Sequence, residues 1–433
     1  MRDIEPANEY TKHMNIKSVL DICKTNLHSL MVQIASSSKK AYYAILFLYM
    51  VSNLIYMIGW ELPLHDFVWN SHVALFSVVM WSSAIYIIVI LAVWKDNWKS
   101  TIKVIIICIS LFGLTVCLSR IMTRDSYAWI VGVLLCILVY GKNYRQILYS
   151  FLLLLLITLT VGLVGLYCGF TFDAKKPYRV YGGHSLGILY PNNWGFLVFA
   201  VLVIIWYLFL RRKKLVSLAL FWIVAVFMFK YITCNTIAAL ALVFPIFASA
   251  AEFLQDHTSI SSTKKAHRTI IYHAIVLLPF IVFGIMMLLC WKMDWVHEHF
   301  YKTPLESAAM RFVEGGYAIR LNGLSLFGQP FKQWDASITD YARDIEMKID
   351  SAFTHYLVIR GVLWMIWILT WIAYAHYLCL KRRDYRLIVI SFFFLVFSMM
   401  ERPGLDVWYN FVLLYPLADF GCINHEKHSL VMT

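Results

Sequence analysis

Charged residues are scarce in this chain. They make up 15% of its 433 residues, against roughly 25% in soluble domains. Hydrophobic residues make up 61% of the chain, and the mean hydropathy is +0.68. A chain this apolar cannot hide its surface from water by folding on itself, so the composition excludes a soluble enzyme, a disordered protein and a collagen-like fibre. It also argues against nucleic-acid binding, despite a formal net charge of +13.

Several sequence motifs are missing as well. None of the nine cysteines forms a C-x-x-C pair, which argues against a disulfide framework and against a thiolate metal site. The chain has no P-loop, G-x-G-x-x-G or H-E-x-x-H motif, so ATP-driven transport and metalloprotease chemistry lose support. No strict D-x-D occurs either, and the nearest acidic pair, in residues 344–346, is interpreted as a solvated helix face. A nucleotide-sugar transferase with a D-x-D-bound cation is therefore not indicated.

Long apolar runs are what the sequence does contain. They predict an all-α, polytopic transmembrane bundle of about twelve helices, since a membrane-spanning helix needs about 20 apolar residues. The expected spans are 41–60, 72–94, 102–119, 126–141, 146–169, 194–210, 215–232, 234–253, 270–291, 352–379, 385–400 and 404–423.

The positive charges test this topology, because short cytoplasmic segments of membrane proteins are rich in Lys and Arg. Alternate segments of the predicted bundle hold 23 of the 38 Lys and Arg residues. This pattern predicts a cytoplasmic N-terminal segment at 1–40, a membrane domain at 41–423 and a cytoplasmic tail at 424–433.

The other fifteen cations run against that rule and gather mostly in two predicted outer loops, 170–193 and 292–351. The second loop, between spans nine and ten, carries seven basic and nine acidic residues. Its apolar anchors predict short helices on the outer membrane surface rather than a loose linker.

The arginines in these loops suit binding of phosphate and pyrophosphate. Because nucleotides are not supplied outside the membrane, the natural activated donor there is a sugar on a polyprenyl pyrophosphate.

Three stretches in this part of the chain carry a family resemblance. They are residues 179–195 (RVYGGHSLGILYPNNWG), 311–328 (RFVEGGYAIRLNGLSLFG) and 349–361 (IDSAFTHYLVIRG). Their order, spacing and topology resemble those of the Wzy-type polysaccharide polymerases, relatives of the O-antigen ligases. Where that family often carries a Ser-Arg pair between spans seven and eight, this chain has Thr233-Cys234-Asn235-Thr236, and Lys230 is the nearest candidate substitute.

The resemblance implies a metal-independent glycosyltransferase of the bacterial plasma membrane that needs no cofactor. It would polymerise undecaprenyl-pyrophosphate-linked oligosaccharide repeat units into surface polysaccharide at the outer face. The implied partners are these lipid-linked substrates and membrane lipids, with a flippase and a chain-length regulator as further candidates, and no nucleic acid.

Ten residues are candidates for this chemistry. Cations stabilise the charge that develops on a departing pyrophosphate, and charges inside a span are functional candidates by default. The catalytic candidates are Arg311, His184 and Arg320, and the substrate-binding candidates are Arg179, Asn192, Asn193, Asp350, His355, Arg360 and Arg120.

Plainer roles compete for several of these residues. Asn192, Asn193 and Asp350 could cap helices. Arg320 could form a surface ion pair. Glu314 is a candidate base.

Two other functions stay open at this point. A ligase that moves a finished glycan to another acceptor would share the family motifs. A lipid-linked oligosaccharide flippase or another transporter would be expected to show internal repeats and midplane charges, and no convincing repeat is present.

Overall fold

The structure is a computed structural model, and it describes most of the chain in separate ranges. These are residues 38–58, 62–93, 139, 142–173, 184–188, 191–210, 213–257, 265–303, 305–329, 349–407 and 409–418. Arg120 and Arg179 lie outside the described residues, as do the expected span 102–119 and all but Val139 of the span 126–141.

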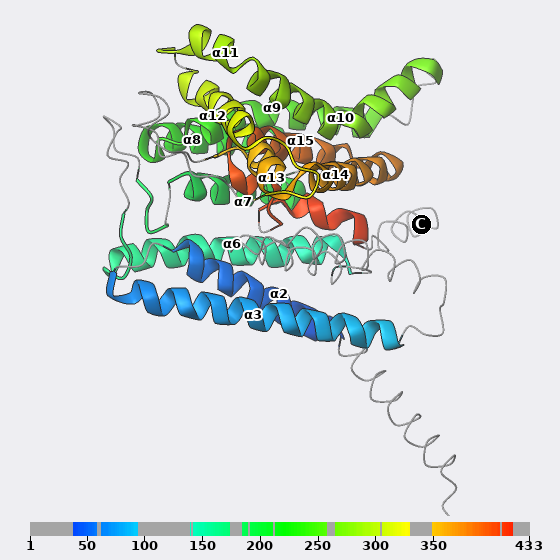
Figure 1. The fold of residues 1–433 in the computed structure, drawn as a ribbon. Coiled ribbons are helices and arrows are strands. Elements are labelled where there is room, and N and C mark those ends of the chain that lie inside the picture. The colour runs from blue at the N-terminus through cyan, green and yellow to red at the C-terminus, as the bar shows by residue number, and fades with distance from the viewer. Residues whose placement is uncertain are drawn as a thin grey trace, which may run out of the picture.

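Within these ranges the chain is helical and contains no β-strand, which confirms the predicted all-α class for this part (Figure 1). The first elements are α2 (Ser38–Met57), α3 (Leu62–Val93), α6 (Tyr144–Tyr167), α7 (Pro191–Phe209), α8 (Lys214–Phe227), the π-helix η2 (Met228–Ile232), α9 (Asn235–His257) and α10 (Lys265–Trp291). The rest are α11 (Met293–Phe300), α12 (Glu306–Asn322), α13 (Ala352–Arg360), α14 (Val362–Arg382), α15 (Tyr385–Met400) and the 3₁₀ helices η4 (Arg402–Leu405) and η5 (Phe411–Leu417).

Six of the described helical segments are long and apolar enough to cross a membrane. They are α6, α7, α8 together with η2, α9, α10 and α14. The first five of these agree with expected spans to within a few residues, while α2 and α15 qualify only as shorter apolar helices. The chain therefore has the character of a membrane protein, and the total of twelve spans stays a prediction.

Three expected spans differ from the structure. The helix expected at 72–94 begins ten residues earlier, since α3 runs from Leu62 to Val93. The span 352–379 is not continuous, because it breaks at Gly361 (φ +88°) into the short helix α13 and the longer α14. Such a positive φ cannot continue a right-handed helix, and glycine adopts it at little cost. The described part of the span 404–423 forms η4 and η5 instead of an α-helix, and Pro416 inside η5 lacks the N–H that an α-helix would use.

Contacts between helix ends gather at two opposite ends of the bundle, one around Asn192 and Glu401 and the other around Tyr207 and Asp384. We call one the site end: it holds the C-terminal ends of α6, η2, α10 and α15 and the N-terminal ends of α7, α9 and α13. The opposite end carries many of the Lys and Arg residues that the charge pattern assigns to the cytoplasm, among them Lys381, Arg382 and Arg386. Which side of a membrane each end faces stays a prediction.

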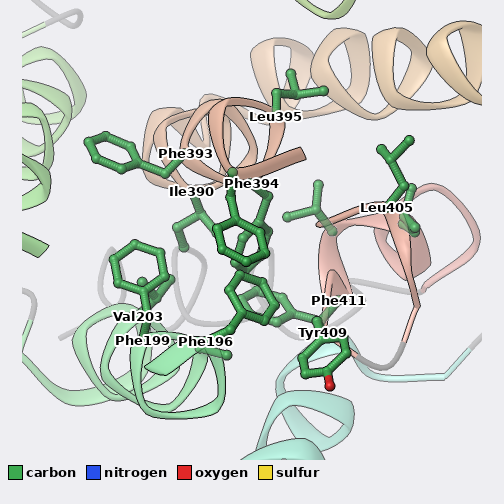
Figure 2. Packing of buried hydrophobic residues seen from close by; sticks show 14 of the residues in the cluster. Phe196, Phe199, Val203, Ile390, Phe393, Phe394, Leu395, Leu405, Tyr409 and Phe411 are labelled. Atoms are coloured by element: carbon green, nitrogen blue, oxygen red, sulfur yellow. The ribbon is translucent and has the colours of Figure 1, made fainter. Parts of the chain in front are cut away.

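The core joins α7, α15, Tyr409 and the 3₁₀ helix η5 through aromatic rings (Figure 2). Phe196 stacks on Phe397 with ring centroids 4.0 Å apart and meets Tyr409 edge-on at 4.9 Å. Phe394 packs edge-on against Phe411 at 5.4 Å. Since lipid is as apolar as these side chains, such close packing, rather than escape from water, holds membrane helices together. Each aromatic pair contributes about 0.5–1.5 kcal/mol beyond burial.

A polar cluster ties helix ends together opposite the site end. The Tyr207 hydroxyl donates to Asp384 Oδ2 at 2.6 Å. Arg386 Nε donates to Gln255 Oε1 at 3.1 Å, and its guanidinium lies 4.9 Å from the Tyr207 ring centroid. These contacts fix the ends of α7 and α9 against the start of α15.

The predicted outer loop 292–351 contains the helices α11 and α12, which lie at the upper left of Figure 1. This confirms short helices in the described part of the stretch, residues 292–303, 305–329 and 349–351, while their place on an outer membrane surface stays a prediction. Helix α12 is not loosely attached, since it packs against α10, α11 and α13. Gly315 and Gly316 lie in the middle of α12 and allow this close approach: a Cβ on Gly316 would sit 2.4 Å from the Cys290 carbonyl oxygen.

Replacing Gly316 by alanine is expected to lower thermal stability in detergent, because the added methyl overlaps Cys290 and overpacking costs about 1–3 kcal/mol. Gly284→Ala is the matched control, since Gly284 also lies inside a helix but a Cβ added there would meet no atom within 4 Å. It should leave the melting temperature unchanged or raise it slightly. Equal melting temperatures for the two variants would contradict the close packing of α12.

Candidate functional site

Arg311 of α12 lies among three carboxylates at the site end. Its Nη1 is 2.6 Å from Asp350 Oδ2 and 3.4 Å from Glu314 Oε2, and its Nη2 is 3.9 Å from Glu401 Oε1. Glu314 is on the same helix, one turn further on. Asp350 directly precedes Ser351, the N-cap of α13, and Glu401 is the C-cap of α15. We call these four residues the Arg311 cluster.

Two further side chains hold the Arg311 cluster in place. Asn192 Nδ2, in the first turn of α7, donates to Glu401 Oε1 at 2.6 Å. Arg402 Nε donates to the carbonyl oxygen of Ile349, next to Asp350, at 2.6 Å. The site thus joins α7, α12, α13 and α15, which are far apart in the sequence.

Burial and charge act against each other on Arg311. Burial by itself would lower the pKa of the guanidinium, but Asp350, Glu401 and Glu314 outweigh burial and raise it. Arg311 therefore stays a cation. The side chain is 19% exposed, so the cluster remains reachable from outside.

Glu314 behaves differently from an ordinary surface carboxyl. Burial raises its pKa to about 7, and the opposing attraction of Arg311 does not cancel that effect. Near neutral pH this group exchanges a proton readily, which is what acid–base catalysis requires.

The structure brings together four of the residues that the sequence singled out: Arg311, Asp350, Asn192 and the candidate base Glu314. Helix α7 begins at Pro191, a common residue at a first helical position, so Asn192 lies inside the helix and contacts Glu401 instead of capping. Asn193, the next residue, is half-buried.

Arg320 is not part of the Arg311 cluster. It comes nine positions after Arg311, which places the two on opposite sides of α12. Its Nη2 lies 3.0 Å from Asp294 Oδ2 of α11, and both side chains are more than half exposed. Such a surface pair contributes little, and this placement favours the plainer role for Arg320.

His355 and Arg360 are both buried on α13. The His355 ring lies edge-on to Tyr356 at 5.1 Å, and Arg360 ends the helix at the break before Gly361. Both therefore lie on the short helix whose N-cap directly follows Asp350.

His184 forms a second polar site with Asp173, which the sequence did not single out. Nδ1 of His184 contacts Asp173 Oδ2. Asp173 Oδ1 accepts from the amides of Ser185 at 2.7 Å and Leu186 at 3.0 Å. Burial tends to raise the pKa of Asp173, but the hydrogen bonds from His184, Leu186 and Ser185 together lower it. The carboxylate therefore stays ionised and orients the imidazole.

Residues 183–187 read GHSLG, which matches the letters of the G-x-S-x-G nucleophile motif. The structural context of that motif is a turn from a strand into a helix that exposes the serine. Ser185 is instead fully buried, and its hydroxyl lies 3.5 Å from Asp173 Oδ1. The segment is held by Gly187 (φ +81°), where a Cβ would come within 2.1 Å of the Gly162 carbonyl oxygen. Hence Ser185 stabilises the loop through its contacts with Asp173, and its buried hydroxyl is not exposed as a nucleophile would be.

Lys230 directly precedes Tyr231, the residue whose backbone is hydrogen-bonded to His184. It is exposed on the π-helix η2, with Nζ 5.5 Å from the centre of the Tyr231 ring. The backbone N–H of His184 donates to the Tyr231 carbonyl at 3.2 Å. Single-turn π-helices occur often at functional sites, and this one ends at Thr233 in the left-handed region (φ 54°).

The segment 323–329 closes the helix break between α13 and α14. The amides of Val362 and Leu363 donate to the carbonyls of Ser325 and Leu326 at 2.9 Å and 3.2 Å. The amide of Gln329 donates to the Ile359 carbonyl at 3.2 Å. The second and third resemblance motifs meet directly at the Arg311–Asp350 pair and again here, where a Cβ on Gly328 would sit 2.2 Å from the Ile359 carbonyl oxygen.

Metal binding has no prepared site in the described ranges: no group of three or more His, Cys, Asp or Glu side chains is placed to share an ion. At the Arg311 cluster the centre of the carboxylates is filled by the guanidinium itself.

The comparisons with known proteins add no relative: no family model, no curated protein and no solved structure matches this chain.

Asp173→Asn is expected to loosen the His184 loop, because it replaces charge-assisted hydrogen bonds, worth about 1.5–3 kcal/mol each, by weaker neutral ones. Hydrogen exchange at the amides of Ser185 and Leu186 should speed up by about tenfold or more, a change of 1.4 kcal/mol being tenfold. Amides in the middle of α6 serve as the internal control and should not change.

The pH dependence of this protection has a definite sign. Since the pKa of Asp173 is lowered from 3.8 in the folded protein, the stabilisation is complete above 3.8 and disappears as the pH falls through the lower folded value. Protection that stays constant through that range would contradict the role of Asp173.

Proposed function

We propose that this chain is a membrane glycosyltransferase that polymerises undecaprenyl-pyrophosphate-linked oligosaccharide repeat units on the outer face of the bacterial plasma membrane. The growing chain would leave its lipid pyrophosphate and join the non-reducing-end hydroxyl of a new repeat unit. The termini and the basic end of the bundle would face the cytoplasm.

One observation carries the proposal. Asn192, Arg311 and Asp350 come from the three separate motifs that resemble the polymerase family, and they lie in one chain of contacts through Glu401. Nothing in a bundle of apolar helices requires these positions to meet. Their convergence supports a common chemical task for the three motifs.

The geometry suits transfer to a hydroxyl acceptor without a metal. An acceptor hydroxyl needs a nearby base and well-oriented neighbours, and the Arg311 cluster offers three carboxylates held by a cation. A dianionic pyrophosphate would be repelled by those carboxylates. The acceptor role of Arg311 is therefore favoured over direct pyrophosphate binding.

The donor side would then fall to the other polar groups of the site end. His184 is 40% exposed and oriented by Asp173, and Lys230 lies next to its anchor Tyr231. Arg179, in the same motif as His184, remains a proposed pyrophosphate ligand on the sequence alone. A cation and hydrogen-bond donors at these positions would stabilise the leaving pyrophosphate.

The direct test is to incubate the purified protein with one lipid-pyrophosphate-linked repeat unit and to separate the products by size. A ladder of lengthening glycans supports a polymerase, and a single transfer to a different acceptor supports the ligase alternative. Transport of the intact lipid-linked glycan across vesicles without any elongation would support the transporter alternative and refute the proposal.

Arg311→Lys is expected to reduce elongation by about 10²-fold or more, because lysine keeps the charge but loses the planar fork that binds several oxygens at once. Arg179→Lys should also reduce it, through weaker pyrophosphate binding. Arg145→Lys is the matched control, since Arg145 is exposed at the start of α6, at the opposite end. If Arg311→Lys and Arg179→Lys both keep full activity, these roles are wrong.

A further inference from the structure

Three carboxylates share one guanidinium in the Arg311 cluster, and with Arg402 nearby two cations face three anions. Besides burial and Arg311, two further charged groups act on the pKa of Glu314: Asp350 before α13 raises it, and Arg402 after α15 lowers it. The Cys290 thiol of α10 lies against the neighbouring Gly315, and Asp294 of α11 is held by Arg320 further along α12. The arrangement carries an excess of negative charge that one proton can relieve.

The three carboxyl groups are held unequally. Asp350 has the shortest contact with Arg311, 2.6 Å, and it precedes the N-terminus of α13, where the helix dipole favours a negative charge. Glu401 accepts a 2.6 Å hydrogen bond from Asn192. Glu314 has a 3.4 Å contact with Arg311, and its side chain is only 14% exposed. The proton is therefore most easily placed on Glu314.

The position of Glu314 also suits a general base. It is partly accessible, it touches the cation that holds the cluster, and Gly315 and Gly316 fix its helix against α10 and α13. A Glu on a rigid helix keeps its carboxyl at a set position, which general-base catalysis depends on.

We infer that Glu314 is the general base of the transfer. Asp350, Glu401 and Asn192 are then positioning residues that hold the side chains of Arg311 and Glu314 in place. The inference rests on the proposed function. The proton of the acceptor hydroxyl passes to the Glu314 carboxylate while the acceptor oxygen bonds to the anomeric carbon. The bond from that carbon to the pyrophosphate oxygen breaks, and the lipid pyrophosphate leaves with the electron pair. Glu314 then returns the proton to water.

This role gives the reaction a pH dependence of known sign. A general base works in its ionised form, so kcat/KM for elongation should rise with pH and level off above the pKa of Glu314, which is about 7. The profile is recorded from two pH units below that pKa to two above it.

Glu314→Gln is the decisive variant, since glutamine keeps the size and hydrogen-bonding shape but cannot take the proton. Elongation should fall by about 10²–10⁴-fold, the usual contribution of a general base, and the remaining activity should no longer rise with pH. Binding of the lipid-linked donor, measured separately on immobilised protein, should be unchanged. The matched control is Glu298→Gln, the same substitution on the exposed face of α11, with wild-type activity and profile.

Each result decides one question. Wild-type elongation together with full activity and an unchanged profile in Glu314→Gln overturns Glu314 as the base but leaves the polymerase standing. If the activity of Glu401→Gln no longer rises with pH while that of Glu314→Gln still does, the assignment is also overturned, and Glu401 is the base. No elongation by the wild-type protein overturns the proposed function itself.

A folding defect in Glu314→Gln would not leave the inference untested, because Glu314→Asp keeps a carboxyl on a shorter arm. This variant should elongate more slowly yet keep the rise with pH. A slow Glu314→Asp without that rise would overturn the assignment.

Discussion

The attraction between one half-buried cation and three carboxylates is the constraint on which the site end depends. Arg311 links its own helix, α12, to the residue before α13 and to the residue after α15, and Asn192 extends the link to α7. Removing the cation would leave several carboxylates facing each other at low exposure, and breaking a buried ion pair costs about 3–5 kcal/mol. The ends of four helices thus depend on a side chain that is also the best candidate for chemistry.

The sequence predicts the helices better than it predicts what they bring together. Apolar runs of sufficient length mark α6 to α10 because the bilayer demands about 20 such residues. Arg311 stands out because it begins a stretch that resembles the polymerase family, and Asp350 because it lies at the start of an expected span, where charge is costly. Their pairing could not be read from the chain, because it depends on how closely α12 approaches α13, which the small residues Gly315 and Gly316 allow.

Other features escape sequence reasoning for local reasons. Glu401 looks like part of a turn with its neighbour Arg402, and only the folded bundle shows it beside Arg311 and Asn192. Asp173 lies eleven residues before His184, with no periodic pattern to link them. The break at Gly361 lies inside an apolar run that hydropathy alone treats as one helix. In each case the signal is a tertiary contact.

The break at Gly361 has a consequence for the segment 323–329. A helix of nine residues such as α13 rises only about 13.5 Å at 1.5 Å per residue, less than half of a hydrocarbon layer about 30 Å thick. Its last carbonyls and the first amides of α14 would lack partners in an apolar layer. The backbone of 323–329 supplies them, while Leu324, Leu326 and Phe327 keep their side chains exposed. The segment 323–329 therefore supports the broken helix through its peptide groups rather than through these three side chains.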